Sequence, residues 1–92
     1  MGTIAARQGR EILENVRYIL AVECLSAAQG IDFLLPLTPG LGTGAACRVI
    51  REVVPHLDED RIPAPDIETI YQLMVNGSLV KGVEAAVGQL NI

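Results

Sequence analysis

The sequence is poor in the residue types on which most active sites and small stapled folds depend. Among its 92 residues are two cysteines, one histidine and no tryptophan, and aromatic residues make up 3% of the chain. Cys24 and Cys47 form no C-x-x-C pair, and His56 lies far from both, so the ligand spacing of a zinc site is missing. We therefore expect two free thiols in a reducing compartment and no metal ligand.

The sequence also offers few residues for nucleophilic catalysis. Ser26 and Ser78 are the two serines, and neither stands in the Gly-x-Ser-x-Gly context of a nucleophile elbow. A single histidine leaves few ways to build a catalytic triad. From the residues alone we predict no catalytic, cofactor-binding or metal-binding residue.

The charge and hydropathy patterns argue against two classes of partner. Seven basic and eleven acidic residues give a net charge of -4, whereas nucleic acid selects for a basic face. No apolar run reaches the roughly 18 residues that span a bilayer, and no signal-peptide pattern is visible at the N-terminus. These features predict a cytoplasmic protein that binds neither nucleic acid nor a membrane.

What is abundant is Ala, Val, Ile and Leu at helical spacing, which predicts an all-α chain. A first helix over about residues 3–29 has Gly30 as a left-handed cap. At about 1.5 Å per residue such a helix is roughly 40 Å long, whereas a compact globule of this size is roughly 32 Å across. The chain must therefore associate or belong to something larger. The expected inward stripe is Leu13, Val16, Leu20, Cys24, Ala27 and Ile31.

About three shorter helices are expected after a covered extended loop over residues 31–37. The first runs over residues 43–54 and is ended by Pro55; its inward residues are Ala46, Val49, Ile50 and Val53. The next starts at Pro65, has its apolar stripe at Ile67, Ile70, Leu73 and Met74, and ends at Gly77. Asn76-Gly77-Ser78 formally matches a glycosylation acceptor, but we interpret it as a helix end followed by a Ser78 cap of the last helix, which carries Leu79, Val83, Ala86 and Val87.

Residues 40–45, GLGTGA, match the loose G-x-G-x-x-A form of a dinucleotide-binding loop. The full fingerprint needs a preceding strand and a later acidic residue that ends a second strand. Asp58 and Asp60 lie near the expected distance but in a loop after a helix. We therefore favour a flexible connection between helices over a nucleotide site.

Three other groups of polar residues have simple structural interpretations. Asp58, Glu59 and Asp60 lack the spacing of a calcium loop and are expected at the surface, with Arg61 as their ion-pair partner. Glu23 is a lone carboxylate in the most apolar stretch, so we expect it to pair with an Arg or Lys of a neighbouring helix. His56 is expected to be a surface or capping residue.

Three ordered segments resemble the C-terminal end of the aromatic amino acid ammonia-lyases, and most closely the bacterial histidine ammonia-lyases. Residues 1–7, MGTIAAR, look like the continuation of the family's Gln-Glu-Asp-His-x-Ser-Met-Gly segment. Residues 20–33, LAVECLSAAQGIDF, resemble its LAIELLAAAQGLDFR stretch, although Leu34 stands near where many members carry Arg. Residues 54–67, VPHLDEDRIPAPDI, resemble its VPxLxxDRxLAPDI stretch.

The resemblance implies that residues 1–92 are a C-terminal helical segment of a larger helical-bundle lyase, without a domain boundary of their own, and that Met1 corresponds to an internal methionine. The family eliminates ammonia from histidine, phenylalanine or tyrosine with a methylidene-imidazolone made from an internal Ala-Ser-Gly, which this chain does not contain. Its enzymes are tetramers, which implies a homo-oligomer or the remainder of the parent enzyme as partner. None of the family's catalytic residues maps onto this chain.

Two hypotheses follow. The chain is a non-catalytic structural and oligomerisation segment of a histidine ammonia-lyase-like enzyme, or it is a standalone helical module that associates with itself or with a separate catalytic chain. An independent small enzyme is a third and weaker interpretation.

Overall fold

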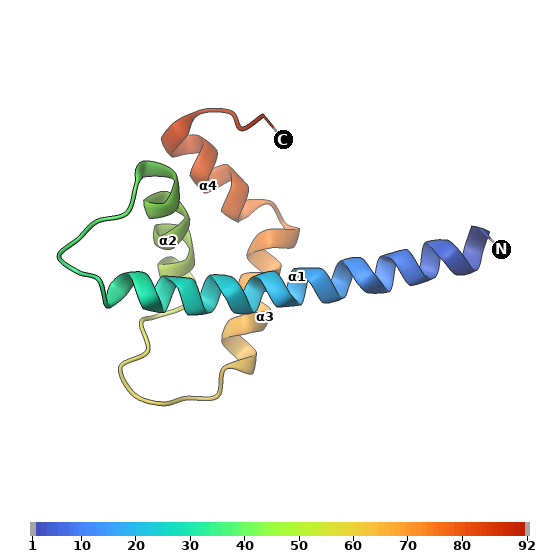
Figure 1. Cartoon of the computed structure of the whole chain (residues 1–92), viewed down its shortest axis with the longest axis horizontal. Coiled ribbons are helices and arrows are strands. Elements are labelled where there is room, and N and C mark those ends of the chain that lie inside the picture. The colour runs from blue at the N-terminus through green and yellow to red at the C-terminus, as the bar shows by residue number, and fades with distance from the viewer. Residues whose placement is uncertain (1, 92) are drawn as a thin grey trace.

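The computed structural model describes residues 2–91, and all of its regular structure is helical (Figure 1). The elements are α1 (Gly2–Asp32), α2 (Leu41–Val53), α3 (Ala64–Val75) and α4 (Ser78–Val87). The prediction of one long helix followed by three shorter ones is confirmed. No helix among these residues is both long enough and apolar enough to span a membrane.

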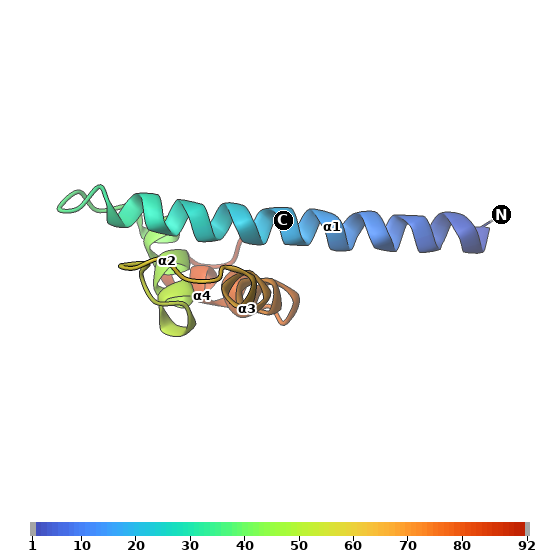
Figure 2. The ribbon, with the colours of Figure 1, turned by 90° about the horizontal axis from the view of Figure 1, so that it is seen from below.

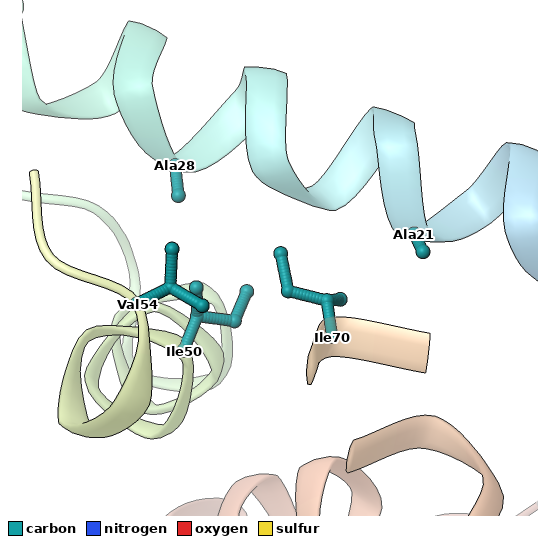
Figure 3. Close-up of a cluster of buried hydrophobic side chains, with 5 residues drawn as sticks. All are labelled: Ala21, Ala28, Ile50, Val54 and Ile70. Carbon is teal, nitrogen blue, oxygen red and sulfur yellow. The ribbon is translucent and has the colours of Figure 1, made fainter. Parts of the chain in front are cut away.

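The three short helices lie together on one side of α1 (Figure 2). α2 packs against α4, α3 packs against α1, and α3 also contacts α2 and α4. Five buried residues meet in the core shown in Figure 3. Ala21 and Ala28 come from α1, Ile50 from α2, Val54 from the end of α2 and Ile70 from α3. Small side chains on α1 face the larger ones of its neighbours, so α1 can approach the core closely.

The face of α1 that meets this core differs from the expected stripe. Ala21 and Ala28 are buried, and Cys24 and Leu25 pack against them at helical spacing. Of the six predicted residues, Cys24 and Ile31 are half-buried, while Leu13, Val16, Leu20 and Ala27 are exposed. The prediction was wrong because α1 is apolar on two sides, and periodicity does not say which side α3 will cover.

The first half of α1, residues 2–16, projects beyond the other helices and is exposed along its whole length (Figure 1). It carries large apolar side chains, including Ile4, Ile12 and Leu13. The molecule is consequently elongated, with principal extents of 54 × 35 × 18 Å and a radius of gyration of 15.1 Å, against about 12 Å for a compact chain of this size. We call residues 2–16 the bare half of α1.

The junction between α1 and α2 also departs from the prediction. Gly30 is not a left-handed cap, because α1 continues through it to Asp32. Residues 33–36 then form a turn rather than an extended loop, with Leu34 N–H donating to the Ile31 carbonyl at 3.0 Å. This turn is not covered: its apolar side chains are exposed, namely Phe33, Leu34, Leu35 and Leu37.

The remaining helix ends follow the expected chemistry with small shifts. α2 ends before Pro55, as predicted, but Val53 is exposed, and Ala45 and Val54 are buried in its place. α3 begins one residue before Pro65, with Asp66 in its first turn. Gly77 separates α3 from α4 in a left-handed conformation with φ of 82°. The Ser78 side chain does not cap α4; instead the Asn76 side chain accepts a hydrogen bond from the Ser78 N–H at 2.9 Å.

Candidate functional site

The densest polar cluster lies where the end of α1 meets the segment after α2, and it is centred on Asp32. One carboxylate oxygen of Asp32 accepts hydrogen bonds from Arg51 Nη2 at 2.6 Å and from Arg51 Nε at 3.1 Å. His56 Nδ1 lies 2.6 Å from the same oxygen. The hydrogen bond from His56 and the bonds and charge of Arg51 hold the pKa of the Asp32 carboxyl below its ordinary value.

Gln29, one turn before Asp32, extends this cluster to the backbone. Its side-chain amide makes two bonds to one residue, because Oε1 accepts from the Leu57 N–H at 3.1 Å and Nε2 donates to the Leu57 carbonyl at 3.0 Å. The remaining ring nitrogen of His56, Nε2, lies 3.4 Å from Gln29 Nε2 and 3.7 Å from Asp58 Oδ1. Together these contacts hold His56 and Leu57 against the end of α1.

Arg61 anchors the other end of the same connection. Its guanidinium pairs with Asp66 at 2.8 Å and donates to the carbonyls of Pro55 at 2.6 Å and His56 at 3.3 Å. The predicted pairing of Arg61 with the acidic run was therefore wrong, although Asp58, Glu59 and Asp60 are exposed, as expected. Arg61 pairs with Asp66 of α3 instead of the acidic run, because its bonds to the carbonyls of Pro55 and His56 fix the direction of the guanidinium.

Two shallow pockets border these clusters, and neither brings a nucleophile to His56. One, of about 340 Å³, is lined by Asp32, Phe33, Leu35, Arg51 and His56. The other, of about 190 Å³, is lined by apolar residues and by Ser26, Gln29, Arg61 and Asp66. Gln29 already bonds to the backbone, and Arg61 and Asp66 bond to each other. Sequence reasoning missed the Asp32 cluster, because its members lie 19 and 24 positions apart.

Cys24 and Cys47 are free, as predicted, and both are half-buried. Burial, and then the nearby carboxylates Glu23 for Cys24 and Asp32 for Cys47, raise the pKa of each thiol. A thiol with a raised pKa is a weak nucleophile at neutral pH, because the thiolate is the reactive form. Within residues 2–91 no group of three or more His, Cys, Asp or Glu side chains is placed to hold a metal ion.

The glycine-rich segment lies inside a helix and not in a loop. α2 begins at Leu41, and Gly44 N–H already donates to the Gly40 carbonyl at 2.7 Å. A Cβ on Gly42 would lie 3.7 Å from Val87 of α4, and a Cβ on Gly82 would lie 2.3 Å from Val49 Cγ2. Gly82 thus lets α2 and α4 approach each other, whereas a Cβ on Gly42 would make an ordinary van der Waals contact. No strand precedes the glycine-rich segment among the described residues. The predicted flexible connection was wrong, and the dinucleotide interpretation loses its structural context.

Glu23 also differs from expectation. It is exposed on α1, and no ion pair to it is found among residues 2–91. The predicted cationic partner is therefore not on a neighbouring helix of this part of the chain.

The geometry thus defines a helical unit clamped by side-chain hydrogen bonds, with a long helix whose first half has no neighbour among residues 2–91. A family model described as aromatic amino acid lyase matches residues 1–52. That is more than half of the chain, and the chain belongs to the aromatic amino acid lyase family.

Its curated relatives are histidine ammonia-lyases. The chain is 50% identical over 90 residues to the histidine ammonia-lyase of Natranaerobius thermophilus, a match that covers 98% of this chain and 18% of the relative. It is 50% identical over 91 residues to that of Sorangium cellulosum and 44% identical over 91 residues to that of Gloeobacter violaceus, each covering 99% of this chain and 18% of the relative. The chain therefore spans less than a fifth of the length of these relatives. No solved structure matches it.

Proposed function

We propose that this chain is a non-catalytic helical scaffold segment of a histidine ammonia-lyase-like enzyme, which eliminates ammonia from L-histidine to give urocanate. In this proposal the enzyme acts in histidine catabolism in the cytoplasm, and the catalytic residues lie outside the 92 residues. The observation that carries it is the 50% identity to a histidine ammonia-lyase over 98% of this chain but 18% of the relative.

The bare half of α1 supports a scaffold role. Residues 2–16 expose Ile4, Ile12 and Leu13, and exposed apolar surface of this extent is typical of an interface rather than of a free surface. An isolated helix without tertiary contacts is marginally stable in water. The segment therefore needs further polypeptide around it.

The residues present do not fit the source of the family's electrophilic group. A methylidene-imidazolone made from Ala-Ser-Gly needs a serine between alanine and glycine, whereas Ser26 stands between Leu25 and Ala27, and Ser78 between Gly77 and Leu79. Ser26 lies within α1 and Ser78 opens α4, so both belong to regular helices.

The alternative is a standalone module that associates with copies of itself. The same exposed side chains of α1 support it, since two bare halves could cover each other. The two proposals differ in what the isolated chain does. A module forms a discrete oligomer, whereas a scaffold segment stays monomeric or aggregates without a defined size.

A transplant tests the proposal. In the histidine ammonia-lyase of Natranaerobius thermophilus, the 90 aligned residues are replaced by those of this chain. We expect the chimaera to release urocanate and ammonia from histidine, and we expect the isolated 92-residue chain and the enzyme with the segment deleted to release neither. A folded but inactive chimaera, or activity of the isolated chain, would contradict the proposal. Sedimentation of the isolated chain as a discrete oligomer would favour the module.

A further inference from the structure

A second apolar face runs along α1 on the side turned away from the other helices. Figure 2 shows α2, α3 and α4 on one side of α1, where Ala21 and Ala28 are buried, and no element on the opposite side. At about 3.6 residues per turn, the residues that point to the opposite side recur at steps of four and three. We call them the outer seam: Ile12, Val16, Ile19, Glu23 and Ala27.

The spacing of the outer seam is that of a helix-pairing surface. The steps of four, three and four residues from Ile12 to Glu23 are the heptad spacing with which one helix packs its side chains between those of another. The last step, from Glu23 to Ala27, is again four. Small residues, Ala5 and Gly9, continue the same spacing towards the N-terminus. Ile12 is 63% exposed and Ile19 is 58% exposed, so the large members of the seam have no cover within residues 2–91.

Glu23 interrupts the seam at a position that helix pairing would bury. Its neighbours one turn away on the outer side are Ile19, Leu20, Ser26 and Ala27. Of these only Ser26 can donate a hydrogen bond to the carboxylate, and a neutral hydroxyl does not compensate its charge. Burying an unpaired carboxylate costs far more than the surrounding apolar contacts return, so the covering helix must bring a cation. A single polar group in such a seam also fixes the register of the two helices.

A second copy of α1 does not supply that cation. The arginines of α1 are Arg7, Arg10 and Arg17, and they lie between about 120° and 160° around the helix from Glu23. Two copies packed seam to seam would therefore bury both glutamates without a basic partner. The charge pattern thus favours a different helix as the occupant.

We propose that the outer seam of α1 binds a helix from the rest of the full-length lyase polypeptide, with an apolar face that carries one arginine or lysine opposite Glu23. This inference rests on the proposed function, because the longer polypeptide supplies the partner. An arginine suits the role better than a lysine, since its planar fork can bond both carboxylate oxygens. The pair sets the register in which this segment docks.

The first test uses the chimaera described above. Glu23→Lys places two like charges in the seam, and we expect the yield of soluble, assembled enzyme to fall about tenfold or more. Glu23→Gln, which keeps the shape but leaves the basic group unpaired, should have a smaller effect of the same sign. The matched control is Glu11→Lys, since Glu11 is exposed on α1 outside the outer seam and should tolerate the same change. Equal losses for Glu23→Lys and Glu11→Lys would overturn the inference.

The second test identifies the partner directly. A photo-crosslinking amino acid at position 23 of the chimaera should couple to a peptide from outside this segment that contains an Arg or Lys. Replacing that basic residue by Glu should restore assembly of the Glu23→Lys variant. Coupling to α1 of a second copy, or to an apolar peptide without a basic residue, would overturn the inference. Failure of the unmodified chimaera to assemble would instead overturn the proposed function and this inference with it.

Discussion

Both halves of α1 carry apolar side chains, more of them in the second half, but the two halves have opposite surroundings. In the second half Ala21 and Ala28 are 0% and 2% exposed against the other helices, whereas in the bare half Ile4 is 58% exposed. Small residues are therefore buried while larger ones are open to solvent, which reverses the usual order. Burial along this helix therefore follows the position of the neighbouring helices and not the size of the side chain, and the large side chains of the bare half have no cover among residues 2–91.

The largest expected effect on stability comes from an Ile→Ala substitution in the core, compared with the same substitution in the bare half of α1. Ile70→Ala removes a fully buried side chain that packs against α1, and should lower the free energy of unfolding by about 2–5 kcal/mol. Ile12→Ala, in the bare half, should cost less than about 0.5 kcal/mol in the isolated chain. Urea unfolding followed by circular dichroism measures both variants. Similar costs would show that the bare half is covered after all.

A pair of glycine substitutions should have effects of opposite sign. Gly82→Ala places a Cβ 2.3 Å from Val49 Cγ2 and should destabilise the chain by about 1–3 kcal/mol, because α2 and α4 must move apart. Gly9→Ala meets nothing within 4 Å and should stabilise α1 by about 0.5–1 kcal/mol. Thermal unfolding of the two variants checks the signs, and a stabilising Gly82→Ala would refute the close approach of α2 and α4.

Loss of the Asp32 cluster should have a smaller effect that depends on pH. Because the folded pKa of Asp32 lies below its ordinary 3.8, its stabilisation is complete above that value and is lost as the pH falls through the lowered pKa. Asp32→Asn should therefore cost about 1 kcal/mol at neutral pH, a figure reduced by partial solvent exposure, and almost nothing below the folded pKa. Unfolding free energies measured from neutral to acid pH test this. A difference that grows with acidity would contradict it.

The smallest effect is expected where the two halves of α1 meet. Tyr18 stacks on Tyr71 with ring centroids 4.2 Å apart, and its hydroxyl donates to Glu68 at 2.8 Å. Tyr18→Phe keeps the stack and loses one exposed bond, so it should change the free energy of unfolding less than the other substitutions do. The bond to Glu68 raises the pKa of Tyr18 to about 12. Spectrophotometric titration should find this value, and Glu68→Gln should lower it.

The architecture was more predictable from the sequence than the contacts between helices. Helical spacing and the Pro55 and Gly77 boundaries located all four helices to within a few residues, because these signals act within a few positions along the chain. The inward face of α1 and the glycine contacts were not predictable, since they depend on which helix lies opposite. Gly82 matters because α4 packs closely against Val49 of α2 there, and nothing near it in the sequence indicates this contact.

The polar cluster around Asp32 was also not predictable from the sequence, for the same reason. Asp32, Arg51 and His56 lie far apart in the sequence, and the residues next to each of them do not indicate a polar cluster. Only the packing of α1 beside the end of α2 brings Arg51 and His56 to one carboxylate oxygen of Asp32. Arg61 was assigned to the nearest acidic residues, but carbonyls of the preceding turn direct it to Asp66.

The connection between α2 and α3 is fastened at both ends, with Gln29 and Asp32 binding residues 56 and 57, and Arg61 binding Asp66. Its exposed middle, Asp58, Glu59 and Asp60, contributes no buried contact. Such a stretch is where a folded chain accepts added residues most readily. It is accordingly the natural place to insert an epitope tag or attach a fluorophore, which would report on docking of the segment without disturbing its helices.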